Sequence, residues 1–210
     1  MSKRGLLAIV SGPAGSGKTS LALAALERNP SDIVRAITVT TREPRPEEKE
    51  GVDYFFMTKS EFEQKCGDDF FAEHVEFNGN YYGTPRHELD RLLRENKTVL
   101  LVIDVVGATD IRRTYSNSTG IYVLPPCYES LRQRLHDRGT APDDLDSRLS
   151  IALREINHIP EYDYFVINDY FEKAYSDFIT ILRVAKAHAV RGNERDLWRA
   201  GRFNEYHTDL

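Results

Sequence analysis

The segment from residue 12 to residue 19 constrains this chain more than any other part of the sequence. It reads Gly-Pro-Ala-Gly-Ser-Gly-Lys-Thr and matches the pattern G-x-x-x-x-G-K-[ST] at every position. Residues 6–10 before it form an unbroken apolar run, which predicts a strand buried on both faces of a parallel sheet. Residues 19–28 after it are rich in Ala and Leu, which predicts a helix. Strand, glycine-rich loop and helix together open a βαβ unit.

This loop predicts a site for the phosphates of a nucleoside triphosphate. Its glycines allow the backbone to fold around an anion, so that successive N–H groups converge on the phosphates. The N-terminus of the following helix adds a positive partial charge. Lys18 is expected to reach the β- and γ-phosphates, and the hydroxyl of Thr19 to bind Mg²⁺. The residues expected to bind the triphosphate are Gly12, Pro13, Ala14, Gly15, Ser16, Gly17, Lys18 and Thr19.

The rest of the chain alternates candidate strands with candidate helices. Apolar stretches predict strands at 99–104, 120–124 and 164–167. Such alternation predicts an α/β domain with a mostly parallel sheet. The candidate helices are 85–95, 110–115, 128–138, 143–157 and 173 to about 190, followed by a separate amphipathic segment at 194–203.

The segment 36–84 interrupts this alternation. The pair Asn78-Gly79 is a strong hairpin signal between the candidate strands 71–77 and 80–82. Ser60 and Glu63 have the spacing of a capping box, which predicts a brief helix at 60–66. With short β-branched and aromatic stretches at 37–41 and 53–57, the segment predicts a small mixed β insertion.

Composition excludes several classes of protein. With 210 residues, 40% of them hydrophobic and 29% charged, the chain has the size and apolar content of one folded domain. A net charge of −5 argues against a dedicated nucleic-acid binder. No apolar stretch approaches the ~18 to 20 residues that span a membrane. Cys66 and Cys127 are too few for a disulfide framework, so we expect reduced thiols in a cytoplasmic protein.

Two further features point to a second anionic substrate. Arg42 and Arg45 lie three residues apart in a proline-restricted loop, and arginine offers planar, bidentate donors to phosphate. Alone, such a pair is typical of a solvated loop; beside a phosphate loop it indicates a second phosphate site. In a strand, Glu73 shares a face with Val75 and Phe77. A carboxylate on this apolar face is either part of a structural ion pair or an acceptor for a ligand.

At these residues the sequence resembles the guanylate kinases. The phosphate loop, Thr40-Thr41-Arg42 with Pro44-Arg45, Asp53-Tyr54-x-Phe56, Glu73 and the run 79–84 follow the family order and spacing, as do 131–139, Arg148 and 167–169. The resemblance covers roughly residues 6–184. It implies one domain with a P-loop kinase fold: a parallel-sheet core (about 1–36, 86–125 and 158–190), a mixed β GMP-binding insertion (about 37–85), a helical lid (about 126–157) and a C-terminal helical extension (about 191–210).

The resemblance also implies an activity and the residues that perform it. It implies phosphoryl transfer from ATP, with Mg²⁺, to GMP and dGMP, in a monomer or homodimer without nucleic-acid or membrane partners. Mg²⁺ would be held by Thr19 and Asp104, Asn168 would lie near the ATP base, and Arg134 would belong to the lid. The implied catalytic residues are Lys18, Arg45, Arg138 and Arg148, and the implied GMP-binding residues are Thr38, Arg42, Arg45, Tyr54, Glu73, Tyr82 and Thr84.

Three positions depart from the family pattern. Thr38 replaces the usual Ser but keeps the hydroxyl, and Val102 stands where one of two aspartates is usual. The spacing from Arg138 to Arg148 is one residue shorter than usual, which leaves the geometry of the lid less constrained.

Two other functions remain open at this point. A catalytically silent binding module of this fold would be expected to lack the phosphate loop. A related kinase acting on a ribose bisphosphate would be expected to lack Glu73 and the Tyr-Tyr-Gly hairpin at 81–83.

Overall fold

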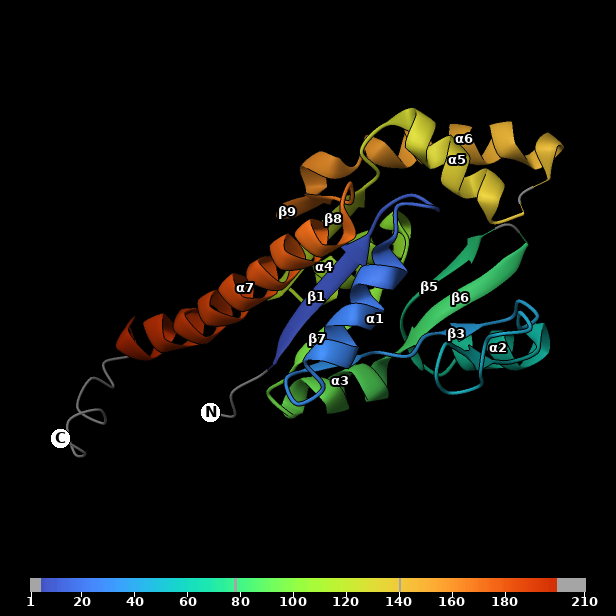
Figure 1. Ribbon diagram of the computed structural model, residues 1–210. Coiled ribbons are helices and arrows are strands. Elements are labelled where there is room, and N and C mark those ends of the chain that lie inside the picture. Colours follow the sequence, from blue (N-terminus) through green and yellow to red (C-terminus); the bar gives the residue numbers. More distant parts are fainter. Residues whose placement is uncertain (1–4, 78, 140, 200–210) are drawn as a thin grey trace.

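The computed structural model describes residues 5–77, 79–139 and 141–199, and its core is a five-stranded parallel sheet (Figure 1). The strand order is β2-β7-β1-β8-β9, and each neighbouring pair is parallel. This confirms the predicted α/β architecture with a parallel core. The strands are β1 (Leu6–Ser11), β2 (Ile33–Arg35), β7 (Thr98–Val102), β8 (Ser118–Leu124) and β9 (Tyr164–Ile167).

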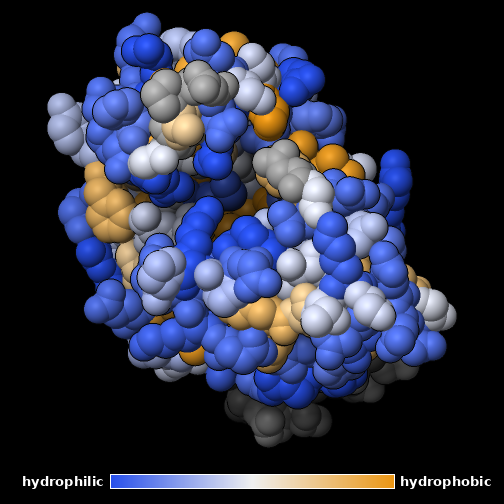
Figure 2. Space-filling model, turned by 90° about the vertical axis from the view of Figure 1, so that its right-hand side faces the viewer, coloured by the Kyte–Doolittle hydropathy of each residue, from blue (hydrophilic) through white to orange (hydrophobic). Residues whose placement is uncertain are grey.

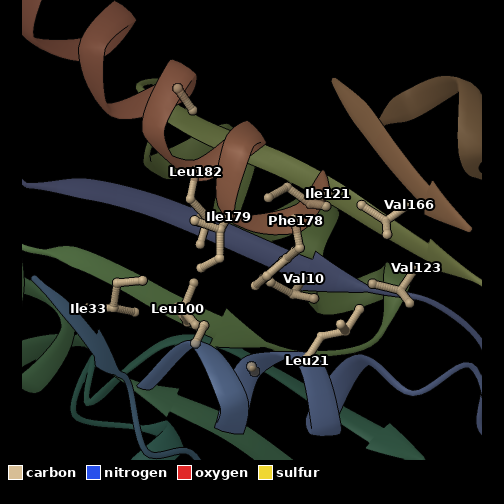
Figure 3. Close-up of a cluster of buried hydrophobic side chains, with 14 of the residues drawn as sticks. Val10, Leu21, Ile33, Leu100, Ile121, Val123, Val166, Phe178, Ile179 and Leu182 are labelled. Atoms are coloured by element: carbon tan, nitrogen blue, oxygen red, sulfur yellow. The ribbon is translucent and has the colours of Figure 1, made fainter. Parts of the chain in front are cut away.

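Helices cover both faces of this sheet. On one face, Val10 of β1 packs in a cluster with Leu21 of α1 (Lys18–Arg28) and Phe178 of α7 (Phe171–Arg199), as Figure 3 shows. On the other face, Ile9 of β1 belongs to a cluster with residues of α3 (Arg86–Arg94) and α4 (Val105–Thr114). Because both faces are buried, the central strands are apolar at consecutive positions, which is the pattern that made β1 recognisable in the sequence.

A second, four-stranded sheet lies beside the core, with the order β4-β3-β6-β5. It pairs β3 with β4 in parallel and the others antiparallel, so the predicted mixed insertion is present. Phe62 stacks between Phe71 and Tyr81, at ring-centroid distances of 4.4 and 5.3 Å. The elements are β3 (Val39–Thr40), β4 (Phe55–Phe56), α2 (Lys59–Cys66), β5 (Phe71–Phe77) and β6 (Asn80–Pro85).

The hairpin between β5 and β6 has the predicted register. Phe77 is paired with Asn80, so two residues remain for the turn, and Gly79 adopts a φ of 73°. Asn78, the other predicted turn residue, lies outside the described residues.

The predicted lid range contains α5 (Tyr128–Asp137) and α6 (Pro142–Ile156), which lie across the top of Figure 1. A short 3₁₀ helix, η1 (Ile159–Glu161), leads from α6 towards β9. The two helices share a small core separate from the main clusters. Its residues are Leu131, Leu135, Leu145, Leu149 and Ala152. Such a self-contained unit is compatible with a lid, although the limits of the lid stay a prediction.

The structure corrects the predicted start of α2. Thr58, not Ser60, is the N-cap: its hydroxyl accepts from the Glu61 N–H, and the Glu61 carboxylate accepts from the Thr58 N–H. The predicted pair with Glu63 is wrong because Thr58 is the residue whose backbone is still extended, with a ψ of 158°.

Other element boundaries also differ from the predictions. β2 was missed because three residues are too few to show a period. Strand β7 ends at Val102, and Asp104 is the N-cap of α4, which begins at Val105 instead of residue 110. The β-branched and glycine residues of its first turn hid the start of this helix. The two predicted C-terminal helices form one helix that continues to Arg199, and residues 200–210 of the predicted extension lie outside the described residues. No helix in the described ranges combines the length and apolar character needed to cross a membrane.

Candidate active site

A cleft of about 290 Å³ lies between the phosphate loop, the insertion and the end of α6. Figure 2 shows this side of the molecule hollowed near its centre, with mostly hydrophilic residues around the opening. The cleft collects residues from segments that are far apart in the sequence. Among the predicted site residues it is lined by Gly12, Ala14, Lys18, Thr19, Thr38, Arg45, Tyr54, Glu73, Tyr82 and Asp104.

The phosphate loop is held from behind by two side chains. Asn168 is buried and its Nδ2 donates to the Ser16 carbonyl at 2.8 Å. Arg134 donates to the carbonyls of Asn168, at 2.8 Å, and Ser16, at 3.4 Å. Gly17 has a φ of 91°, and a Cβ there would lie 2.1 Å from Asn168 Nδ2. In this structure both side chains therefore fix the loop backbone, while their predicted roles at the ATP base and in the lid stay predictions.

Lys18 lies at the centre of a group of charges. Its Nζ donates to the Pro13 carbonyl at 3.3 Å. Burial lowers the pKa of Lys18; the nearby carboxylates of Glu155 and Asp104 oppose this shift, and the guanidinium of Arg138 adds to it. A lysine that faces both signs of charge inside a cleft suits a ligand whose phosphates bring negative charge of their own.

Asp104 and Thr19 both line this cleft, and both side chains carry oxygen atoms. Asp104 Oδ1 accepts from the N–H groups of Val106, at 2.8 Å, and Gly107, at 3.0 Å, whereas Oδ2 accepts no hydrogen bond from the described residues. Within those residues, no cluster of three His, Cys, Asp or Glu side chains is able to cage a metal. Mg²⁺ usually takes one or two protein oxygens and completes its shell with substrate phosphates and water, so these two residues fit it. Val102 also lines the cleft, without a ligand atom.

The two arginines of the predicted acceptor site share one carboxylate. Arg42 Nη2 lies 2.8 Å from both oxygens of Glu48, and Arg45 Nη1 lies 3.8 Å from one of them. The Arg45 side chain is 62% exposed and reaches the cleft, whereas Arg42 is turned to Glu48 and lies 5.6 Å from the Tyr54 ring centre. Glu48 was not predicted because nothing in the sequence distinguishes it from Glu47 and Glu50 on either side.

Glu73 is a buried carboxylate that has no cation partner among the described residues. Its Oε1 accepts from the Thr84 hydroxyl at 2.5 Å, and its side chain lines the cleft beside buried Thr38. Burial raises the pKa of Glu73 to about 7, although the bond from Thr84 opposes the shift. Of the two readings that the sequence left open, a structural ion pair is wrong. Val75 and Phe77 line the same cleft, as the strand alternation predicted.

Some predicted residues lie outside the cleft, and some lining residues were not predicted. Arg138 follows α5 and Arg148 lies on α6; both are exposed, and neither lines the cleft. Glu155 and Arg35 line it but were not predicted. Glu155 stands seven residues after Arg148 on one helix, a spacing that places both on the same side and was available as a signal.

Comparisons with known proteins give one consistent result. The family model described as guanylate kinase matches residues 4–185. A guanylate kinase of Clostridium perfringens is 40% identical over 208 residues, covering 99% of this chain and 95% of that protein. A guanylate kinase of Escherichia coli K12 is 39% identical over 194 residues, covering 91% and 94%. The crystal structure of guanylate kinase from Anaplasma phagocytophilum superposes with a TM-score of 0.72 at 33% identity, covering 88% of this chain and 87% of that one.

The raised pKa of Glu73 predicts that this residue lowers the stability of the folded protein at neutral and higher pH. The folded protein binds this proton more tightly than the unfolded chain, so the contribution of Glu73 to stability falls as the pH rises from 4.5 to about 7. Glu73→Gln removes the buried charge but keeps an acceptor for Thr84. We compare the unfolding free energy of this variant with that of the wild type at each pH. The variant minus wild-type difference should be about 2 kcal/mol larger at pH 8 than at pH 5.

Urea unfolding at the two pH values measures this difference. Glu76→Gln is the matched control, because Glu76 lies on the same strand with its side chain exposed, and it should show no such gain. Equal behaviour of the two variants would show that the Glu73 carboxylate is not destabilised by burial.

Proposed function

The chain belongs to the guanylate kinase family, and we propose that it transfers the γ-phosphoryl group of MgATP to GMP, with dGMP as a second acceptor. The observation that carries this proposal is Glu73, a buried carboxylate without a cation partner among the described residues, in the same cleft as Lys18 of the phosphate loop. A buried group of this kind is costly for the fold, so a ligand that offers it hydrogen-bond donors has a large advantage.

The donor half of the proposed site is the phosphate loop. The backbone N–H groups of the loop and the Lys18 ammonium would bind the β- and γ-phosphates of ATP. Thr19 and Asp104 would hold Mg²⁺, which when bound neutralises charge on the phosphates. Asn168 would lie near the ATP base while its amide keeps the loop in shape through the Ser16 carbonyl.

The acceptor half of the proposed site, formed by residues of the insertion, would bind GMP at both its base and its phosphate. Guanine offers two adjacent donors, N1–H and the exocyclic amine, to the Glu73 carboxylate, and adenine lacks both on this edge. Thr38 and Thr84 would donate to the carbonyl side of the base. At the other end, the phosphate of GMP would compete with Glu48 for Arg42 and Arg45, and the hydroxyls of Tyr54 and Tyr82 would donate to it.

Phosphoryl transfer between the two nucleotides then requires mainly that the protein position them and neutralise their negative charge. The acceptor is already an anionic phosphate oxygen, so no strong general base is needed, and in-line transfer is favoured by neutralising the charge that gathers between the nucleotides. Lys18 and Arg45 supply two positive charges to the cleft. Arg138 and Arg148 would supply more if α5 and α6 moved towards the loop, and such closure would also exclude water.

A coupled assay with ATP tests the proposal against its rivals. GMP and dGMP should be phosphorylated, whereas AMP, UMP and a ribose bisphosphate should be poor acceptors. Lys18→Ala should abolish turnover with the circular dichroism spectrum unchanged, because Lys18 is the side-chain cation of the loop. Turnover of Lys18→Ala within a few-fold of wild type, or a preference for another acceptor, would contradict the assignment.

Glu73→Gln tests how the acceptor base is read. The substitution keeps the size of the side chain but turns one acceptor into a donor, which would face a donor of guanine. We expect kcat/KM for GMP to fall on the order of 100-fold, equivalent to ~3 kcal/mol. The affinity for ATP should change little, since the phosphate loop is a separate part of the cleft. Normal phosphorylation of GMP by this variant would mean that guanine is recognised elsewhere.

A further inference from the structure

Arg35 is an arginine of the cleft for which neither the sequence pattern nor the proposed mechanism gives a role. It is the last residue of β2, at the carboxyl edge of the sheet where the phosphate loop also lies. Its Nη2 donates across to the Asp53 carbonyl in the insertion at 3.1 Å, and its side chain lines the cleft.

The guanidinium of Arg35 lacks part of the hydrogen-bond and charge partners that it could have. Its Nε is buried without a hydrogen-bond partner, and no carboxylate of the described residues forms an ion pair with it. The carboxylate of Asp53, whose backbone carbonyl Arg35 contacts, accepts instead from the Lys49 N–H, which lies 2.9 Å from Asp53 Oδ2. A buried donor without a partner is rare in folded proteins and disfavours the fold. Because Arg35 lines the cleft and has no carboxylate partner among the described residues, an anion that enters the cleft would compensate its charge.

The charge balance of the acceptor end shows what kind of anion fits. Arg42 and Arg45 share the carboxylate of Glu48, so this group of three residues leaves about one unit of positive charge. A phosphate monoester carries ≈ −1.5 to −2 at pH 7. Arg35 supplies the second positive charge that the Arg42–Arg45–Glu48 group lacks.

The position of Arg35 relative to Tyr54 connects it to the phosphate end of the cleft. Burial raises the pKa of Tyr54, and among the charged groups nearby Arg35 opposes this rise most, ahead of Arg42. Arg35 also contacts the carbonyl of Asp53, the residue before Tyr54, so it lies at the same end of the cleft as the tyrosine that, under the proposed function, donates to the phosphate of GMP.

We propose that Arg35 is a third arginine for the acceptor phosphate, binding the 5′-phosphate of GMP together with Arg42 and Arg45. The inference rests on the proposed function, because it requires a nucleoside monophosphate in this half of the cleft. Arg35 then acts on ground-state binding of the acceptor, from the end of β2 in the core sheet.

Calorimetric titration with GMP and with guanosine tests this role. Arg35→Met removes the charge, and Arg35→Gln removes it while keeping a polar side chain that can form hydrogen bonds, so a loss shared by both variants follows the charge and not the polarity of the side chain. Both should bind GMP about tenfold more weakly than wild type, with guanosine binding unchanged, since one charge-assisted contact is removed.

Arg86→Met is the matched control. Arg86 also has a buried Nε without a partner and donates to a backbone carbonyl, that of Phe71 at 3.1 Å, but it does not line the cleft. This variant should bind GMP as wild type does. An unchanged GMP affinity in the Arg35 variants, or equal losses for GMP and guanosine, would overturn the inference. Failure of the wild-type protein itself to bind GMP would instead contradict the proposed function.

Discussion

The parallel pairing of β1 between β7 and β8 determines where the core half of the site lies. Val10 pairs with Val102, and Ser11 pairs with Tyr122, so these strands end at one edge of the sheet. Ligand sites of open α/β sheets assemble at the carboxyl ends of such strands. Here that edge receives the phosphate loop after β1, Asp104 after β7, Asn168 after β9 and Arg35 at the end of β2. Residues scattered over more than half of the sequence meet because all these strands run in one direction.

The cleft stores electrostatic strain that its ligands would relieve. Glu73 is buried without a cation among the described residues, and Arg35 is half-buried without a carboxylate, yet the two stand in one cleft and do not pair. An isostructural protein with an apolar residue at position 73 would be more stable above pH 7, because it would not carry the raised pKa of this carboxyl group. Each of these two groups is complementary in charge to the part of GMP that it would contact. The Glu73 carboxylate would accept from the donors of the base, and the Arg35 guanidinium would bind the phosphate. Under the proposed function, the groups whose burial disfavours the fold are thus the groups that would bind the acceptor.

The structural elements that the sequence predicted correctly are those with a long and regular sequence pattern. The core and the β5–β6 hairpin were predictable because a buried strand, a glycine loop and an alternating strand each have a period or a fixed spacing. Glu73 was predictable as a site candidate because it is a carboxylate on an apolar face. The places of Glu48, Arg35 and Glu155 in the cleft could not be predicted. The role of a charged residue depends on the groups around it in the fold, and the sequence alone does not show these groups. The start of α4 was hidden because one cap, Asp104, outweighed the poor helix propensity of the residues that follow it.

That same cap joins the two halves of the cleft. Asp104 Oδ1 fixes the first turn of α4 by accepting from the N–H groups of Val106 and Gly107, and Asp104 also lines the cleft. Gly107 in turn lies against the Glu73 carboxylate: a Cβ at this position would stand 2.7 Å from Glu73 Oε2, closer than real side chains allow. A side chain at position 107 would therefore displace the Glu73 carboxylate from its present position. The first turn of α4 thus contacts both the carboxylate proposed to hold Mg²⁺ and the carboxylate proposed to bind guanine, so under the proposed function one turn of backbone would relate the two substrate sites.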